Sequence, residues 1–395
     1  MRDELIAIFR AGVARADPEA AVAAALGETV APDGILALGK ASVAMARAAL
    51  ARFPGTPCLV ATNAENAAEL PGARVMVGAH PVPDARSLAA GEALLARAET
   101  LVAGQRCLVL VSGGASALAV APVAGVTLAD KAEVARRLLA SGLDIAAMNR
   151  VRARLSRIKG GGLARAAAPA AVEALILSDV VDCDLAAVAS GPTLPSAEGP
   201  DPRATLQAMG LWQGLPSGCR AAIVALPAPT PPSTARLVGS NRLSAEAMLA
   251  AAPGATLEAA PLVGDVAEAA ARVAAAARRG PGTTLFGGET TVVLRGPGRG
   301  GRNQELALRV ALALERLGRP WAFLSGGTDG RDGPTEAAGA VVDGGTLARI
   351  AAAGLDVRWM LARNDSNPAL AAAGDLLVTG GTGTNVADLQ VLRVG

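Results

Sequence analysis

The chain has 395 residues, of which 51% are hydrophobic and 18% are charged, a composition typical of a folded globular protein with two or three domains. Its net charge of +2 and its aromatic content of 2%, with no tyrosine, argue against nucleic acid as a partner. No apolar run approaches the roughly 18 residues of a membrane span, so we expect no membrane partner.

The first predicted element is an amphipathic helix in MRDELIAIFRAG, residues 1–12. Asp3 and Glu4 occupy the positions where a signal peptide carries positive charge, so we expect a cytoplasmic protein. The four cysteines are scattered without a C-x-x-C pair, which makes a disulfide framework or a zinc site improbable.

Positive charge comes almost wholly from arginine, and the only lysines are Lys40, Lys131 and Lys159. A bias in residue usage is sufficient by itself to explain this pattern. Where arginine fills the surface roles, however, a retained lysine is a better candidate for a functional residue.

The first loop of interest is in GILALGKAS, residues 34–42, where Gly34, Gly39 and Lys40 have the spacing of a Walker A motif. The intervening residues read as a strand, and no Ser or Thr follows the lysine directly, so the spacing is a coincidence. A strand over 35–38 followed at once by a helix places Lys40 at a carboxyl strand end, where α/β sheets bind ligands. The alternative is a cation that merely ends a strand.

A second loop, SGGASAL, follows the predicted strand 107–111. Ser112, Gly113, Gly114 and Ser116 suit a nest that cradles phosphate, although a tight strand-to-helix turn explains them equally well. His80, in the rigid loop HPVPD, is the one base that a Ser-His-Asp hydrolase would have here, and a structural role is the favoured interpretation.

The next stretch, MNRVRARLSRIKGGGLARAA, carries many cations. We interpret it mainly as a solvated helix face that ends at Gly160–Gly162. A cationic helix end beside a polyphosphate is the secondary interpretation.

Two acidic loops each follow an apolar strand. SDVVDCD contains Asp179, with Asp182 and Asp184 beyond it, and SGGTDGRDGPT contains Asp329 and Asp332. Carboxylate oxygens suit magnesium, especially where substrate phosphates complete its coordination. Asp-Gly pairs are also ordinary turn formers, so it is the presence of two such loops that favours a metal role.

The loop RGPGRGGRNQE has Gly296, Gly298 and Gly301 at the G-x-G-x-x-G spacing of a dinucleotide fold. The following strand, WAFL, has no acidic residue placed for a ribose hydroxyl. Because Arg302 and Arg299 offer guanidinium forks, we favour an anion-clamping loop over a nicotinamide site.

Apolar runs alternate with helical segments along the chain, which predicts an α/β fold with parallel strands covered by helices. The proline-rich stretch 226–235, LPAPTPPSTA, is the best linker. We therefore predict two domains, 1–230 and 231–395.

Several long motifs occur in one order over nearly the whole chain, among them ALGKAS, GAHPVPD, LVSGGASAL, SDVVDCDLAAVASGPT, GGETTV, GRGGRNQELAL, SGGTDGRDGPT and TGTNVADL. Together they resemble the glycerate 2-kinase family, whose C-terminal part is the MOFRL domain and some of whose members carry the label hydroxypyruvate reductase. The resemblance implies a larger Rossmann-like N-terminal domain, a smaller α/β MOFRL domain and an active site in the cleft between them.

The resemblance also implies transfer of the ATP γ-phosphoryl group to the 2-hydroxyl of D-glycerate, with Mg²⁺ or another divalent cation. We expect a monomer or homodimer, although the sequence does not determine the oligomeric state. The resemblance assigns the family's functional lysine to Lys40 and its functional arginine to Arg302. Asp179 is the expected catalytic and metal residue, Asp329 a second metal ligand, and the loop 112–116 the nucleotide site. In one departure, Gly381 stands where we expect proline in the family's C-terminal motif.

Two rivals remain. An NAD(P)H-dependent hydroxypyruvate reductase is favoured by the glycine spacing and the older label. A non-catalytic protein that binds a nucleotide or a sugar acid would explain the same loops without turnover.

Overall fold

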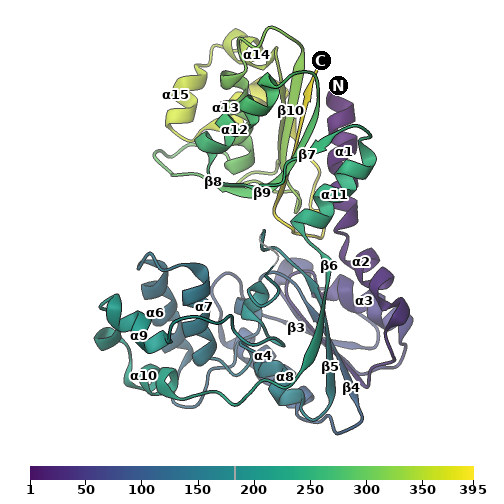
Figure 1. Ribbon diagram of the computed structural model, residues 1–395, viewed down its shortest axis with the longest axis vertical. Helices are drawn as coiled ribbons and strands as arrows, with labels where there is room; N and C mark the ends of the chain where they lie inside the picture. The colour runs from purple at the N-terminus through teal and green to yellow at the C-terminus, as the bar shows by residue number, and fades with distance from the viewer. Residues whose placement is uncertain (182–183) are drawn as a thin grey trace. The chain divides into compact units, whose positions relative to one another are not determined.

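A computed structural model describes residues 1–181 and 184–395. The chain forms two compact units, each built on its own sheet (Figure 1). The parallel-sheet unit comprises Pro18–Ser178 and Asp184–Val238. The mixed-sheet unit comprises Met1–Asp17, a short segment that starts at Asp179, and Gly239–Gly395. Within the described residues, the helices are too short or too polar for any to cross a membrane.

The parallel-sheet unit contains a six-stranded sheet in the order β3-β2-β1-β4-β5-β6. Its central strand β1 is fully buried and pairs in parallel with β2 on one side and β4 on the other. The strands are β1 (Gly34–Leu38), β2 (Cys58–Thr62), β3 (Ala73–Val77), β4 (Arg106–Val111), β5 (Ala171–Leu177) and β6 (Ser233–Gly239).

This strand order is that of a doubly wound Rossmann-like sheet. Successive strands are added on one side of β1 up to β3, and then on its other side from β4 onward, so the winding reverses between β1 and β4. Ligands bind such sheets outside the carboxyl ends of the strands at that reversal. The loops that follow β1 and β4 are the ones that contain Lys40 and Ser112–Gly114.

Helices cover this sheet and form a separate small core in which α6, α7, α9 and α10 pack around Val134, Leu138, Val151, Leu206 and Ile223. Figure 1 shows these four helices gathered together. The α-helices are α2 (Pro18–Ala25), α3 (Ser42–Arg52), α4 (Ala85–Ala98), α5 (Ala115–Leu118), α6 (Leu128–Leu139), α7 (Ile145–Arg154), α8 (Gly162–Ala167), α9 (Pro202–Ala208) and α10 (Ser217–Val224). The 3-10 turns are η1 (Leu26–Glu28), η2 (Ala64–Asn66), η3 (Val188–Ser190) and η4 (Trp212–Gly214).

The mixed-sheet unit contains a sheet in the order β12-β11-β10-β13-β9-β7, with β8 paired to β9. Strand β13 runs antiparallel to both β10 and β9 and so lies inside the sheet. The strands are β7 (Thr256–Leu257), β8 (Leu262–Asp265), β9 (Gly282–Thr291), β10 (Trp321–Gly327), β11 (Gly339–Asp343), β12 (Leu376–Leu377) and β13 (Asp388–Val394). The helices are α1 (Arg2–Arg15), α11 (Asn241–Ala251), α12 (Val266–Arg278), α13 (Arg302–Ala313), α14 (Thr346–Ala352), α15 (Val357–Ala362) and α16 (Ser366–Ala372).

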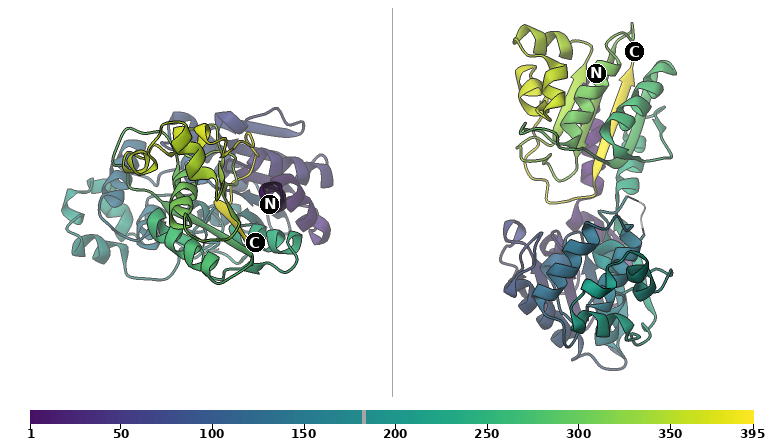
Figure 2. Two further views of the ribbon diagram at one scale, coloured as in Figure 1. Left: turned by 90° about the horizontal axis from the view of Figure 1, so that it is seen from above. Right: turned by 90° about the vertical axis from the view of Figure 1, so that its left-hand side faces the viewer.

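The N-terminal helix α1 belongs to the mixed-sheet unit, although the rest of that unit lies more than 160 residues further along the chain. Leu5, Ile8 and Phe9 form its buried face, and α1 lies beside α11 (Figure 1), both in the unit that Figure 2 shows from two further sides. Gly12 permits this close approach, because a Cβ there would lie 2.7 Å from the Cδ1 atom of Leu389.

The predicted α/β class with two domains is confirmed. The division into 1–230 and 231–395 stays a prediction about domains. The compact units change at Val238, eight residues beyond the predicted boundary, and they place Met1–Asp17 with the C-terminal segment.

Candidate active site

Backbone contacts join the loop after β1 to the loop after β4. The Lys40 amide donates to the Gly113 carbonyl at 2.9 Å, and the Ala41 amide donates to the Ser112 hydroxyl at 3.1 Å. Gly39 has a φ of 126°, and a Cβ on it would lie 2.2 Å from the Ser112 Oγ. These two loops therefore form one rigid assembly at the point where the winding of the sheet reverses.

The Lys40 side chain lies along this assembly. A Cβ on Gly114 would lie 3.0 Å from the Lys40 Cγ and 3.3 Å from the His80 Cδ2, so all three residues meet there. Burial lowers the pKa of His80, the charge of Lys40 lowers it further, and Glu65 opposes both. Burial and the nearby Lys40 therefore both favour the neutral form of the His80 imidazole.

The predicted nucleotide residues fall into two groups. Ser112 is buried, and its hydroxyl accepts the Ala41 amide, so it holds the two loops together. Ser116 lies on the short helix α5 and accepts a hydrogen bond from the amine of the buried Lys159. Their contact with a nucleotide stays a prediction.

In the mixed-sheet unit, Arg302 is the first residue of α13 and is held by two carboxylates. Its Nε and Nη2 atoms donate to Asp388 at 2.6 and 3.0 Å, and Nη2 lies 3.1 Å from Glu289. Burial opposes the charge of the guanidinium, but the hydrogen bonds and charge of Asp388 raise the pKa of Arg302 above its usual value. The guanidinium is thus fixed in orientation and remains charged.

The carboxylates around Arg302 repel one another. Burial raises the pKa of Glu289, Arg302 lowers it, and Asp388, Asp179 and Asp329 raise it again. Burial also raises the pKa of Asp388, which is fully buried. The centre therefore holds more negative than positive charge, which favours a cation among its ligands.

Asp329 and Asp388 both approach Gly327. A Cβ on Gly327 would lie 3.1 Å from the Asp329 Oδ1 and 3.5 Å from the Asp388 Oδ1. Asp179 belongs to the same unit and influences Glu289, whereas Asp182 lies outside the described residues. Asp329 thus lies near Asp388, the partner of Arg302, and Asp179 is linked to the same centre through its electrostatic influence on Glu289.

These residues fit magnesium by their chemistry, since hard carboxylate oxygens surround a centre with excess negative charge. The described residues contain no group of three or more His, Cys, Asp or Glu side chains arranged to hold a metal ion by themselves. A magnesium ion carried on substrate phosphates needs only one or two protein carboxylates, so the donor set suits that mode.

A further carboxylate, Asp332, fixes the start of α13. It accepts the backbone amides of Asn303 at 3.1 Å and Gln304 at 2.8 Å, which are amides of the first helical turn. Burial raises the pKa of Asp332 to about 6, against these hydrogen bonds. Gly301 leaves room for the contact, because a Cβ there would lie 2.2 Å from the Asp332 Cγ.

The glycine spacing that suggested a dinucleotide site has a packing explanation. A Cβ on Gly296 or Gly298 would lie 2.8 or 2.4 Å from backbone atoms of Arg363. The Asn364 side chain accepts the Arg295 amide at 2.6 Å. The strands on either side of this loop, β9 and β10, are separated in the sheet by the antiparallel β13, so the loop does not belong to two adjacent parallel strands.

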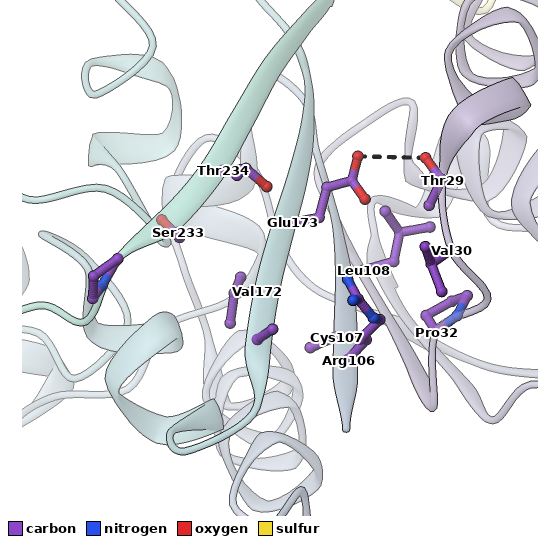
Figure 3. Close-up of a pocket in the computed structure, with 12 residues that line it drawn as sticks. Thr29, Val30, Pro32, Arg106, Cys107, Leu108, Val172, Glu173, Ser233 and Thr234 are labelled. Carbon is purple, nitrogen blue, oxygen red and sulfur yellow. Dashed lines mark hydrogen bonds between the residues drawn. The ribbon is translucent and has the colours of Figure 1, made fainter. Parts of the chain in front are cut away.

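A pocket of about 250 Å³ lies at the opposite, amino ends of β4, β5 and β6 (Figure 3). Its charged Glu173 accepts Arg236 at 3.0 Å and Thr29 at 3.4 Å, and Arg236 also donates to the Ala25 carbonyl. None of the predicted site residues lines it. Because its polar groups satisfy one another, we assign this pocket a structural role.

Sequence reasoning missed Asp388 and Glu289 as site residues, although both lie in motifs that carry the family resemblance, TGTNVADL and GGETTV. It treated the Lys40 loop and the Ser112–Gly114 loop as separate candidates, and it found Arg302 and Asp329 in the other half of the chain. The structure assigns the first group to the parallel-sheet unit and the second, with Asp179, to the mixed-sheet unit.

Comparisons with known proteins find family matches in both halves of the chain and relatives that are similar over most of its length. Residues 4–224 match the family described as Domain of unknown function (DUF4147), and residues 282–388 match the MOFRL family. A protein named "Putative hydroxypyruvate reductase" from Agrobacterium vitis is 40% identical over 100% of this chain and 94% of its own length. A protein named "D-glycerate 2-kinase" from Thermotoga maritima is 36% identical over 90% of this chain and 89% of its own length.

The fold is also that of a solved structure. The crystal structure of a glycerate kinase from Thermotoga maritima has a TM-score of 0.93 and 32% sequence identity, and the match covers 100% of this chain and 99% of that one.

Proposed function

The chain belongs to the glycerate kinase family, with an N-terminal DUF4147 domain and a C-terminal MOFRL domain, and on this premise we propose that it transfers the γ-phosphoryl group of ATP to D-glycerate. The observation that carries the proposal is the whole-chain likeness to a glycerate kinase, since it includes both units and every charged loop. The 2-hydroxyl is the acceptor and 2-phosphoglycerate the product, as the name of the Thermotoga relative indicates.

Lys40 and Arg302 act on the charge of the transferred group. Phosphoryl transfer depends mainly on positioning and on neutralising charge over the equatorial oxygens. The Lys40 backbone is fixed just beyond the carboxyl end of β1, where an anion is expected to bind. Asp388 engages the Nε and Nη2 atoms of Arg302, and within the described residues no hydrogen bond engages Nη1, so Nη1 is available to a substrate oxygen.

Asp179 and Asp329 would hold magnesium, which supplies neutralising charge on the polyphosphate when bound. Asp179 also orients the acceptor hydroxyl. A cytoplasmic location and a monomeric or dimeric state stay predictions.

The test is to incubate the protein with ATP, Mg²⁺ and D-glycerate and to identify the product by phosphorus NMR. We expect 2-phosphoglycerate and one ADP per product. Formation of 3-phosphoglycerate would contradict the assigned acceptor, and the absence of any phosphoglycerate would contradict the kinase.

The reductase interpretation is checked in parallel with hydroxypyruvate and NADH or NADPH. We expect no oxidation of the nucleotide, because the glycine loop is occupied in packing against Arg363 and Asn364. Stabilisation of the protein by ATP or glycerate without turnover would instead favour the non-catalytic binding protein.

A further inference from the structure

The parallel-sheet unit contains a cavity of about 290 Å³ with an unusual charge distribution. Lys131, Arg152 and Lys159 line it, together with Ser116 and an apolar wall. The apolar wall includes Val120, Val134, Leu138, Met148 and Leu155. We call this cavity the cationic pocket.

The three cations are not neutralised by the protein. No carboxylate lines the pocket, and none of the three forms an ion pair within the part of the chain that the structure describes. The Lys131 amine is buried and has no hydrogen-bond partner there. A second cavity, of about 520 Å³, makes a useful contrast: its Arg157 pairs with Glu92, and its Arg154 and Arg165 donate to backbone carbonyls.

Burial and mutual repulsion disfavour the charged forms of these side chains when no ligand is bound. Burial and the charge of Arg152 lower the pKa of Lys131 to about 8. Burial and the charges of Arg152 and Lys131 lower the pKa of Lys159 well below its usual value. An apolar cavity that concentrates like charges is stabilised by an anion that enters it.

The pocket adjoins the Lys40 loop. Ser116 lies two residues after Gly114, the residue that contacts Lys40 and His80, and Pro81 and Pro83 of the His80 loop line the pocket wall. On the other side, Lys159 donates to Ser190 at 3.3 Å and to the Ala189 carbonyl at 3.4 Å. Ala189 and Ser190 have φ values of 53° and 59°, so a strained turn helps to hold this amine.

We infer that the cationic pocket binds the polyphosphate chain of the nucleotide substrate, with Lys131 and Arg152 as its phosphate ligands and with Lys159 holding Ser116 and the turn at Ala189 and Ser190 in the pocket wall. This inference rests on the proposed kinase function. A cluster of Lys131, Arg152 and Lys159 with no carboxylate among them suits a polyphosphate, whereas glycerate carries a single negative charge. The apolar wall offers a surface for the nucleoside, as in ligand sites that combine apolar lining with a few polar groups.

The first experiment measures binding without turnover. Calorimetry gives the Kd of tripolyphosphate, inorganic phosphate, ATP, AMP and D-glycerate for the wild type, Lys131→Met and Arg152→Met. Each substitution is expected to weaken tripolyphosphate and ATP by about 10- to 100-fold, and AMP and D-glycerate much less. Arg136→Gln is the matched control, because Arg136 lies on the same helix as Lys131 and its side chain is 70% exposed.

Thermal unfolding of the ligand-free variants separates a binding role from a structural one. Lys131→Met should leave the Tm unchanged or raise it, because it removes a buried charge without a partner. Lys159→Met is not used, since Lys159 donates several hydrogen bonds that the fold needs.

Three results of the binding experiment would overturn the inference. They are unchanged tripolyphosphate binding in both variants, inorganic phosphate that binds as tightly as tripolyphosphate, and loss of D-glycerate binding with polyphosphate binding retained. A lowered Tm of the ligand-free Lys131→Met would overturn it as well. The same measurements distinguish an error in the proposed kinase function from an error in the proposed pocket. Polyphosphate binding that depends on Lys131 without phosphoglycerate formation would reject the kinase and keep the pocket, whereas turnover with ATP binding unaffected by the variants would do the opposite.

Discussion

Lys40 is fixed through its backbone, while its side chain runs along Gly114. Removing the ammonium should therefore leave the two loops intact and remove only the charge. We expect Lys40→Ala to lower kcat by roughly 10²- to 10⁴-fold in the ATP and D-glycerate assay, the usual loss for one positioned charge. Arg47→Gln, on α3 with an exposed ion pair to Glu19, is the control and should retain wild-type turnover. Normal turnover by Lys40→Ala would remove Lys40 from the site.

Asp388 acts as a positioning residue for Arg302, since both of its carboxylate oxygens accept from the guanidinium. Asp388→Asn should lower kcat by roughly 10- to 100-fold through misplacement of Arg302. It should also lower the free energy of unfolding by about 1–3 kcal/mol. Asp343→Asn is the matched control, because Asp343 also accepts two arginines, Arg2 at 2.7 Å and Arg349 at 3.0 Å. Asp343→Asn should lose stability but keep kcat; equal kcat losses in both variants would reduce Asp388 to a structural role.

At the scale of elements, the joint between the loops after β1 and β4 depends on Gly39. Gly39→Ala introduces both an unfavourable φ of 126° and an overlap with Ser112. We expect unfolding in urea to show a loss of about 2–5 kcal/mol. Gly280→Ala has a similar φ of 135° but no atom within 4 Å, so it should lose only about 1–2 kcal/mol. Equal losses would show that backbone conformation, and not the contact with Ser112, requires the glycine.

The cap of α13 predicts a dependence on pH. The pKa of Asp332 is raised from 3.8 to about 6 in the folded chain, so the folded state binds this proton more tightly than the unfolded state does. The Asp332 contribution to stability is therefore fully present below about pH 4 and is lost as the pH rises through about 6, a change on the order of 2–3 kcal/mol. The stability of the wild type relative to Asp332→Asn should rise as the pH falls from 7 to 4. A difference that is constant with pH, measured by urea unfolding, would contradict the raised pKa.

Patterns that involve neighbouring residues were predictable from the sequence, and patterns that join distant segments were not. The rule for carboxyl ends of parallel strands was enough to place Lys40 at a ligand-binding edge, and the structure adds that the Ser112 loop meets it there. No such rule links Arg302 to Asp388 or Asp332 to α13, because these contacts depend on the order of strands in a mixed sheet. The glycine spacing of 296–301 was ambiguous for the same reason, since its packing partner Arg363 lies elsewhere in the chain.

The three lysines that this arginine-rich chain retains all lie in or beside candidate binding sites, which a bias in residue usage does not by itself predict. Lys40 lies in the candidate active site, and Lys131 and Lys159 line the cationic pocket. The helix with Arg152 was interpreted mainly as a solvated face, whereas the Arg152 side chain lines that pocket, and the secondary interpretation, a helix end beside a polyphosphate, stays a prediction.

For the molecule as a whole, α1 is predicted to stabilise the mixed-sheet unit and not the unit that follows it in sequence. Phe9→Ala should cost about 3–5 kcal/mol in that unit. Tryptophan fluorescence can distinguish the unfolding transitions of the two units, because Trp321 belongs to the mixed-sheet unit and Trp212 to the parallel-sheet unit. In variants that keep a single tryptophan, Phe9→Ala should move the Trp321 transition, and Leu206→Ala, in the other core, should move the Trp212 transition. A shift of the Trp212 transition alone by Phe9→Ala would contradict this assignment.

The position of α1 also has a consequence for how the chain is made. Its apolar face leaves the ribosome about 370 residues before β13, which at 5–20 residues per second is roughly 20–75 s. Because β13 lies between β10 and β9, those strands acquire their shared partner only when Asp388–Val394 has been synthesised. The parallel-sheet unit has all its strands by Gly239 and can fold while the mixed-sheet unit is still being synthesised, whereas Leu5, Ile8 and Phe9 can pack on a complete mixed sheet only after β13 has been made.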